Sequence, residues 1–287
     1  MAAPRAQPLF FGTLVNITDF RCRHPDSGCS AEEYAAADQL VFIRGGVFVR
    51  HDGNRRVLAE PTSVLLFNRQ QPYRVSHPHG GGDDCTVLAF APGVCDAPFR
   101  ATHARVPPAT LLRVQSLRRR LRAGVASDLE AEETALEQLG ALLAATPDIK
   151  NGKGEFEDSP TERRRHEMVE ATKLTLASPP NARMSLSELA RAVDCSPFHL
   201  SRIFRQRVGL PVYQYLLRLR LAVALDRIVE DGVNLSALAF DLGFSSHSHL
   251  TTLFRRAFGV PPSMLKKTAT GPLVRRLRRD ASHRSGL

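Results

Sequence analysis

The sequence of 287 residues contains no tryptophan, and none of its apolar runs approaches the ~18 residues that a transmembrane helix needs. Its first residues, Met1 to Arg5, are not followed by the apolar stretch of a secretory signal peptide. Five cysteines at scattered spacings are an odd number, which in a reducing compartment indicates free thiols rather than a disulfide framework. We therefore expect a cytoplasmic protein that does not enter a membrane.

The signatures of several enzyme classes are also missing. No Ser-His-Asp nucleophile elbow occurs, and the Gly80–Asp83 run lacks the Lys-Ser/Thr ending of a phosphate-binding loop. The composition, 43% hydrophobic and 24% charged, excludes collagen-like, coiled-coil and wholly disordered chains. From the sequence we predict no catalytic residue, no metal ligand and no cofactor.

Positive charge is distributed unevenly along the chain. Residues 1–160 contain 18 Lys and Arg against 19 Asp and Glu, whereas residues 161–287 contain 21 against 10. The whole formal excess of +10 therefore lies in the second segment. A balanced segment joined to a basic one is typical of a sensing or catalytic domain attached to a domain that binds a polyanion.

Short β-branched and aromatic runs fill residues 9–95 at roughly ten-residue spacing, and turn residues separate them. The runs are 40–43, 47–49, 55–58, 64–67, 73–75 and 86–90. Because no helical period intervenes, we predict a small antiparallel sandwich or barrel. Four polar side chains there are able to contact a small molecule, but we expect ordinary surface or edge positions for them: Tyr34, Arg50, Tyr73 and Arg74.

Leucines recur at three- and four-residue steps over residues 111–145, with a turn predicted at Gly124 and Ser127. The first predicted helix is basic and the second is acidic, so their faces attract each other. Two interpretations stay open: a helical hairpin within one chain, or a dimer interface formed by the leucine stripes. The Pro- and Gly-containing stretch 146–158 predicts an exposed linker.

The basic segment contains an internal duplication. Residues 189–193 match residues 238–242 at an offset of 49, and a one-residue insertion near His247 raises the offset to 50. Each copy predicts a short helix, a tight turn, a second helix, a glycine stop and a proline. The residues matched at the larger offset are Leu200, Phe204, Arg205, Gly209 and Pro211 with Leu250, Phe254, Arg255, Gly259 and Pro261.

Local signals delimit the predicted helices. Ser185, Ser196 and Asn234 stand where helices begin and are good N-caps, the first of them in a capping-box pattern. Asp194 and Gly243 stand at the two tight turns, and both residue types tolerate a left-handed backbone.

Two helices joined by a tight turn form a helix-turn-helix, whose second helix enters the major groove of DNA. Arginine contacts guanine or phosphate, serine and threonine contact phosphates or base edges, and a ring contacts the thymine methyl group. The alternative interpretation is that these side chains form an ordinary solvated helical face, or that Phe198 is turned into the core. That interpretation would be preferred for a single helix, but two matching copies in a basic segment disfavour it. We predict DNA contacts from Phe198, Ser201, Arg202 and Arg205 in the first copy and from His247, Ser248, Thr251, Thr252 and Arg255 in the second.

Residues 161–267 resemble the AraC/XylS-type transcription regulators through the runs Leu200–Arg205, Gly243–Leu250 and Phe254–Pro262. The resemblance implies promoter DNA as a partner, with RNA polymerase as a further partner if the protein is an activator. It implies that the helix from Pro211 to about residue 230 joins both units rigidly, so that they meet major-groove faces ~34 Å apart. Thr252 stands where relatives often have a base-contacting arginine, which implies weaker base reading by the second copy.

Residues 9–145 resemble, less specifically, the cupin-like barrel and dimerisation helices of the same family. This resemblance implies a homodimer and a small-molecule effector of unknown identity. The predicted fold class is therefore α+β, with an antiparallel cupin-like β-barrel ahead of an all-α double helix-turn-helix. The predicted segments are 1–145 for sensing and dimerisation, 146–158 as linker, 159–270 for DNA binding and 271–287 as a basic tail.

A cupin-type metal enzyme, or a metal or thiol sensor, is the alternative in the N-terminal segment. His77 and His79 form a His-x-His pair, but Pro78 interrupts any strand, and no matching Glu or His follows at strand spacing. We expect a buried strand cysteine and loop histidines in solvent. A closed sensor site requires the fold to bring together residues from this set: Cys22, His24, Cys29, His77, His79 and Cys85.

Overall fold

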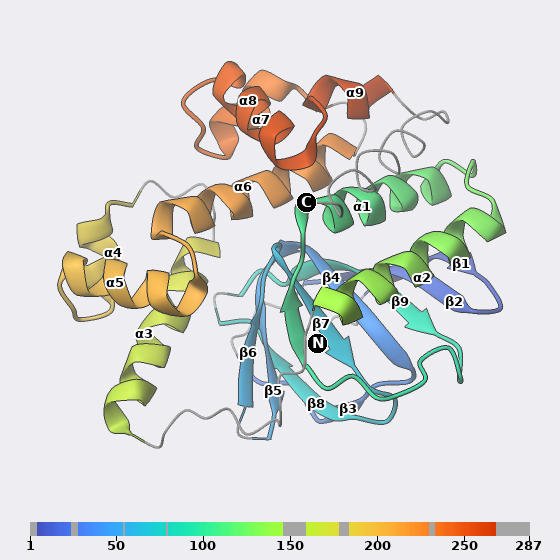
Figure 1. Ribbon diagram of the computed structural model, residues 1–287, viewed down its shortest axis with the longest axis horizontal. Coiled ribbons are helices and arrows are strands. Elements are labelled where there is room, and N and C mark those ends of the chain that lie inside the picture. Colours follow the sequence, from blue (N-terminus) through green and yellow to red (C-terminus); the bar gives the residue numbers. More distant parts are fainter. Residues whose placement is uncertain are drawn as a thin grey trace.

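The computed structural model describes residues 5–23, 28–53, 55–78, 80–145, 159–177, 184–229 and 233–267. Strands and two helices form the N-terminal part, and helices alone form the C-terminal part (Figure 1). The strands are β1 (Arg5–Phe11), β2 (Val15–Cys22), β3 (Glu33–Tyr34), β4 (Asp38–Gly46), β5 (Phe48–Asp52), β6 (Arg55–Ala59), β7 (Ser63–Phe67), β8 (Pro72–Ser76), β9 (Asp83–Phe90) and β10 (His103–Arg105). The helices are α1 (Pro108–Arg122), α2 (Asp128–Ala145), α3 (Pro160–Ala177), α4 (Leu186–Ala192), α5 (Pro197–Val208), α6 (Val212–Val229), α7 (Leu235–Asp241), α8 (His247–Phe258) and α9 (Pro262–Lys267).

The strands form two antiparallel sheets. The six-stranded sheet has the order β1-β2-β9-β4-β7-β10, and the four-stranded sheet has the order β3-β8-β5-β6. The α+β fold class, with an antiparallel N-terminal β-structure ahead of helices, is confirmed. The strands β1 and β10 extend beyond the region for which strands were predicted.

The six-stranded sheet is buried on both faces, and strand alternation divides its side chains between two cores. Leu40 and Phe42 of β4 belong to the core shared with α1 and α2. Val41 and Ile43 of the same strand belong to the core between the two sheets. This two-residue period explains why the central strands are continuous apolar runs in the sequence.

The predicted helical hairpin is confirmed as α1 and α2, with Gly124 in the left-handed conformation at the turn between them (φ 65°). Arg120 of α1 pairs with Glu130 of α2 at 2.7 Å, as expected for a basic helix beside an acidic one. Leu112 and Leu139, one on each helix, are buried against the six-stranded sheet.

The predicted helix starts in the C-terminal part are also confirmed. Ser185 forms a complete capping box, and the Ser196 hydroxyl accepts a hydrogen bond from the His199 amide at 3.2 Å. Asn234 caps α7 by accepting from two backbone amides. The predicted linker 146–158 and the basic tail 271–287 lie outside the described residues.

Taken singly, the helices of the described part are too short or too polar to cross a membrane. The consecutive helices α5 and α6 pass this test only as a pair, and the pair is bent by 57°.

The two tight turns use different residues in the same left-handed conformation, Asp194 at φ 52° and Gly243 at φ 73°. We expect Gly243→Ala to destabilise the helical part by about 1–2 kcal/mol, because a Cβ is unfavourable in this conformation. Asp194→Gly is the matched control and should not destabilise it, because glycine relieves the same strain. Urea unfolding followed by far-UV circular dichroism checks both, and equal effects of the two variants would contradict the strain argument.

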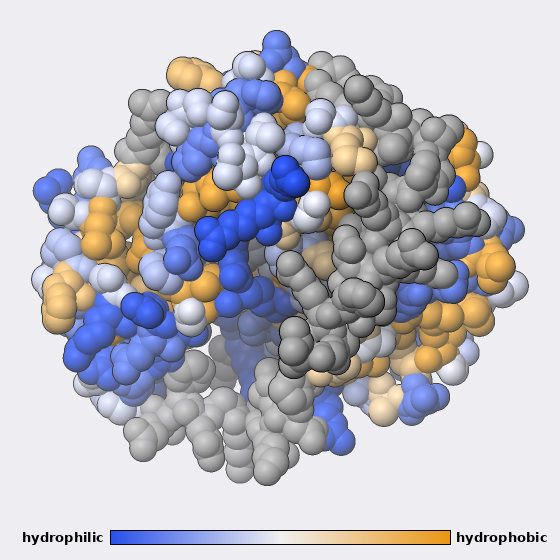
Figure 2. All heavy atoms as spheres, turned by 45° about the horizontal axis from the view of Figure 1, so that its top comes forward, coloured by the Kyte–Doolittle hydropathy of each residue, from blue (hydrophilic) through white to orange (hydrophobic). Residues whose placement is uncertain are grey.

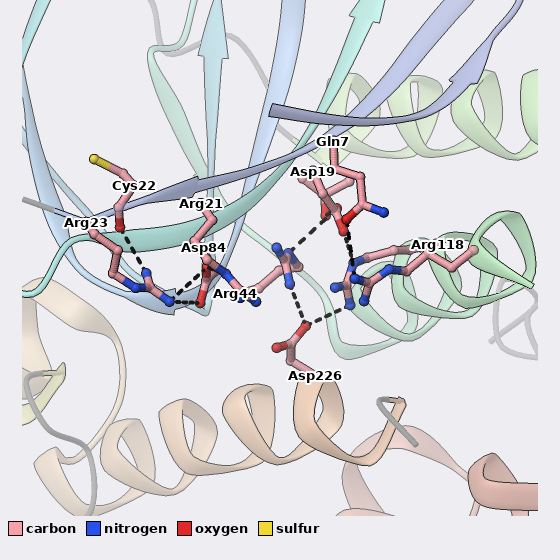
Figure 3. Close-up of polar contacts among 11 residues, drawn as sticks. Gln7, Asp19, Arg21, Cys22, Arg23, Arg44, Asp84, Arg118 and Asp226 are labelled. Carbon is pink, nitrogen blue, oxygen red and sulfur yellow. Dashed lines mark hydrogen bonds and ion pairs between the residues drawn. The ribbon is translucent and has the colours of Figure 1, made fainter. Parts of the chain in front are cut away.

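A buried ion cluster connects the N-terminal part to α6 (Figure 3). Arg118 of α1 contacts Asp19 of β2 at 2.7 Å and Asp226 of α6 at 3.1 Å. Arg44 of β4 lies 3.3 Å from Asp226 and 3.8 Å from Asp19. Burial alone would lower the pKa of Arg44, but the carboxylates of Asp226 and Asp19 outweigh it and raise this pKa. These four residues, the buried ion cluster, therefore hold α6 against the sheet.

Candidate nucleic-acid interface

The second helix of the first unit, α5, has one buried face and one open face. Leu200, Ile203 and Phe204 are buried in the core of the helical part. Phe198 is 79% exposed, so the interpretation that places it in the core is wrong. Ser201, Arg202 and Arg205 are exposed on the same helix. An aromatic ring this exposed is suited to contact a partner.

The second helix of the second unit, α8, repeats this division. Leu250 and Phe254 are buried, whereas His247, Ser248, Thr252 and Arg255 are exposed. Thr251 is half-buried, and its hydroxyl lies 3.4 Å from His247 Nε2. All nine predicted contact residues thus lie on the sides of α5 and α8 that their cores do not occupy.

Two neighbouring histidines of α8 have different environments. His249 Nδ1 lies 2.9 Å from the Ser245 hydroxyl, and its ring packs edge-on against Phe244 with the ring centres 5.7 Å apart. His249 therefore serves the turn between α7 and α8. His247, two residues earlier, is exposed and lies on the open face.

The arginines of these helices also divide by role. The side chains of Arg202, Arg205 and Arg255 make no ion pair or hydrogen bond to any described residue, so their guanidinium groups are available to an anion. Arg207 of α5, by contrast, pairs with Glu162 of α3. Arg256, exposed beside Arg255, adds charge to α8 and is not among the residues predicted from the sequence.

The connecting helix α6 contacts both units. Tyr215 packs against Phe204 of the first unit with the ring centres 5.5 Å apart. Arg220 donates a hydrogen bond of 2.9 Å to the carbonyl of Gly243, at the turn of the second unit. A helix of 18 residues is about 27 Å long, which is comparable to one turn of DNA. In Figure 1, α6 runs from α5 on the left to α7 and α8 at the top.

The structure brings only part of the predicted sensor set together in the N-terminal part. Cys22 and His77 lie close to each other, with Asp83, which the sequence reasoning missed, as a third member. His77 is 3% exposed, so the expectation of a loop histidine in solvent is wrong. Cys85 is buried as expected of a strand cysteine, and Cys29 is exposed. His24 and His79 lie outside the described residues.

Arg50 is fully buried, so the expectation of a surface or edge position for it is wrong. Its guanidinium donates to the Asp52 carboxylate at 2.9 Å and to the Leu66 carbonyl at 2.7 Å. It also lies over the Phe67 ring, 3.8 Å from the ring centre. Burial lowers the pKa of Arg50, and the Asp52 carboxylate opposes that shift. Strand alternation places Arg50 on the same face of β5 as buried Phe48, which is the signal that the sequence reasoning did not use.

Two short helix pairs, each with a tight turn and an open second helix, define a double helix-turn-helix protein. A family model described as a helix-turn-helix domain matches residues 189–268. A putative AraC-like transcription regulator of Streptomyces lividans is 32% identical over 105 residues, which are 36% of this chain and 34% of that protein. The transcriptional activator RhrA of Rhizobium meliloti is 24% identical over 226 residues, 77% of this chain and 70% of RhrA. The C-terminal part therefore carries a helix-turn-helix domain, and over this length the chain is similar to AraC-like regulators.

Several relatives match only part of this chain. The chain spans about a third of the length of the regulators from Streptomyces lividans and Escherichia coli, and 66% of the activator AarP of Providencia stuartii. Among solved structures, ToxT of Vibrio cholerae aligns over 90% of this chain and 100% of its own, at 12% identity and a TM-score of 0.35.

Proposed function

We propose that the protein is a sequence-specific DNA-binding regulator of transcription, which contacts promoter DNA through α5 and α8. The observation that carries the proposal is that each of these two helices buries an apolar face and exposes a face that carries arginine. The helix-turn-helix domain and the names of its relatives support it. Direct base contacts are assigned to Arg202, Ser201 and Phe198, and to His247, Ser248, Thr251 and Thr252. Arg205 and Arg255, later in their helices, suit phosphates equally well.

The two parts of the chain have different roles in this proposal. Residues 1–145 are assigned to sensing and dimerisation, and residues 159–270 to DNA binding. A regulator of this kind works on chromosomal DNA, so we place it in the cytoplasm and assign it no catalytic reaction. An activating mode would make RNA polymerase a further partner.

A small-molecule effector has a place to bind in the N-terminal part. A hollow of about 350 Å³ lies between the segment 94–101 and α2, with Leu66, Phe99 and Leu139 in its lining. This volume is within the range of small-ligand sites. It supports an effector-responsive N-terminal part.

Selection from random duplex DNA with the full-length protein, followed by footprinting of the selected sequence, tests the proposed function. We expect two short boxes about one helical turn (~10 bp) apart, because α6 holds the two units side by side. A dimer should protect two copies of this pair of boxes.

Failure of the full-length protein to select a sequence is not decisive by itself, because the N-terminal part can hold the helical part in an inactive arrangement. The same selection is therefore repeated with full-length Asp226→Asn, which breaks the buried ion cluster and which far-UV circular dichroism must first show to be folded. Only salt-sensitive, sequence-blind binding by both proteins would show that the regulator assignment is wrong.

We propose that α2 forms the homodimer interface. Leu129, Leu136 and Leu143 follow one another at seven-residue spacing and lie on one face of the helix. Leu129 is 75% exposed and Leu143 is 44% exposed, although leucines at this spacing normally face a partner. Figure 2 shows apolar side chains gathered on the right-hand side of the molecule, where α2 lies in Figure 1 together with β1 and β2.

The double variant Leu129→Glu/Leu143→Glu is expected to be monomeric, because facing charges replace the apolar contact. Sedimentation equilibrium against the parent protein measures the change. Phe240→Ser, which removes another large apolar side chain that is 73% exposed, is the matched control and should leave the dimer intact. A dimer that persists in the double variant at parent affinity contradicts the assignment to α2.

A further inference from the structure

Three metal-binding side chains from distant places in the sequence meet at one end of the two sheets. One donor atom each from Cys22, His77 and Asp83 lies within 4.8 Å of the other two. Cys22 ends β2 and Asp83 begins β9, and the two residues are paired in the six-stranded sheet. His77 directly follows β8 of the four-stranded sheet. The donors therefore come from both sheets.

The exposure of the three side chains suits a binding site with an entrance. His77 and Asp83 are 3% and 7% exposed, whereas Cys22 is only partly buried. His77 Nε2 lies 2.7 Å from Asp83 Oδ1, so these two donors already face each other. The buried Phe48 ring lies beside the His77 ring, with the ring centres 6.0 Å apart.

The backbone around these residues is too close for any side chain. A Cβ at Gly82, where φ is 80°, would lie 2.0 Å from the Cys22 carbonyl oxygen. A Cβ at Gly46 would lie 2.2 Å from the Gly82 carbonyl oxygen. Three strands thus converge here, and the position of Asp83 relative to Cys22 is fixed by the main chain rather than by flexible side chains.

We propose that Cys22, His77 and Asp83 form a binding site for a thiophilic divalent cation of the zinc class. A thiolate, an imidazole and a carboxylate are the donor types that zinc takes in proteins, whereas calcium and magnesium prefer oxygen alone. Three protein ligands leave a fourth position, which the partial exposure of Cys22 opens to water. The proposal concerns metal binding alone and does not depend on DNA binding.

Binding of the cation at this site requires each ligand to present a lone pair, and one proton is released. The Cys22 thiol loses its proton to solvent and binds as a thiolate. His77 binds through the lone pair of Nε2, with its single ring proton on Nδ1, and Asp83 binds as a carboxylate. The 2.7 Å between His77 and Asp83 must widen to about 3.3 Å around a tetrahedral ion, which a small side-chain rotation provides.

Titration of the full-length, reduced and chelator-treated protein with Co²⁺ tests the proposal. We expect one tightly bound equivalent with a thiolate-to-cobalt charge-transfer band, and displacement of the cobalt by Zn²⁺. Cys22→Ser should abolish the band, and Asp83→Asn should keep it. Both should weaken binding more than about 100-fold, because loss of an outer-shell partner alone costs about 10- to 100-fold. Cys95→Ser, which removes another partly buried thiol, is the matched control.

A second measurement on the unmodified protein guards against variants that do not fold. Zn²⁺ should slow the alkylation of Cys22, read by peptide mass spectrometry, while exposed Cys29 continues to react. The proposal is overturned if the folded parent protein shows no charge-transfer band, or if the band survives in Cys22→Ser. Alkylation of Cys22 at the same rate with and without Zn²⁺ would overturn it as well.

Discussion

Arg202→Ala is expected to weaken binding to the selected operator by about 1–3 kcal/mol and to relax the preference for one base pair of one box. Arg202 lies on the open face of α5, and its side chain has no ion pair or hydrogen bond among the described residues. Its guanidinium is therefore free to form a bidentate contact with guanine. Titration of the variant against the operator and each single-base substitution of that box measures both effects.

Two comparisons make this prediction specific. Arg74→Ala removes an exposed arginine from β8, whose ion pair with Glu32 spans 4.0 Å, and it should leave operator affinity unchanged. The dependence on salt separates base from phosphate contacts, because a lost phosphate contact lowers the salt slope by about one. An equal loss on every DNA sequence would refute base reading by Arg202 and leave it a phosphate contact.

The helical part was largely predictable because its determinants are local and occur twice. Ser185, Ser196 and Asn234 each cap a helix within three residues of themselves, so the sequence alone locates the helix starts. The turn residues Asp194 and Gly243 differ in type, but the duplication places both at equivalent positions. The exposure of Phe198 followed from the helical period once its neighbours were assigned to the core.

The N-terminal part was less predictable, because its informative contacts join residues far apart in sequence. Asp19 and Asp226 share the same two arginines across 207 positions, and no local pattern links an acidic residue in a strand to one in a helix. Arg50 looked like an edge residue because the Leu66 carbonyl and the Phe67 ring, which surround its guanidinium, lie 16 and 17 positions away on another strand. Asp83 was missed as a neighbour of Cys22 because strand register is set by tertiary pairing.

Asp226→Asn is expected to lower the free energy of unfolding by about 3–5 kcal/mol, because it leaves buried arginines with one carboxylate fewer. Asparagine keeps the shape of the side chain, so the loss reports charge rather than packing. Arg44 and Arg118 are 3% and 1% exposed, so water cannot replace the missing carboxylate. Urea unfolding followed by far-UV circular dichroism measures the change in a chain without tryptophan.

The double variant Arg44→Met/Asp226→Asn decides whether pairing is the cause. If Asp226 stabilises the fold by neutralising Arg44 and Arg118, removing Arg44 together with Asp226 should recover part of the lost unfolding free energy. The double variant then loses less than the sum of the two single variants, which is a favourable coupling free energy. Asp241→Asn is the control, because its ion pair with Arg227 is exposed and spans 3.8 Å, and exposed pairs contribute little. Additive losses in the double variant would contradict the pairing argument. Recovery would show that the attachment of α6 to the sheet depends on charge balance, and α6 is the helix that spaces the two DNA-binding units.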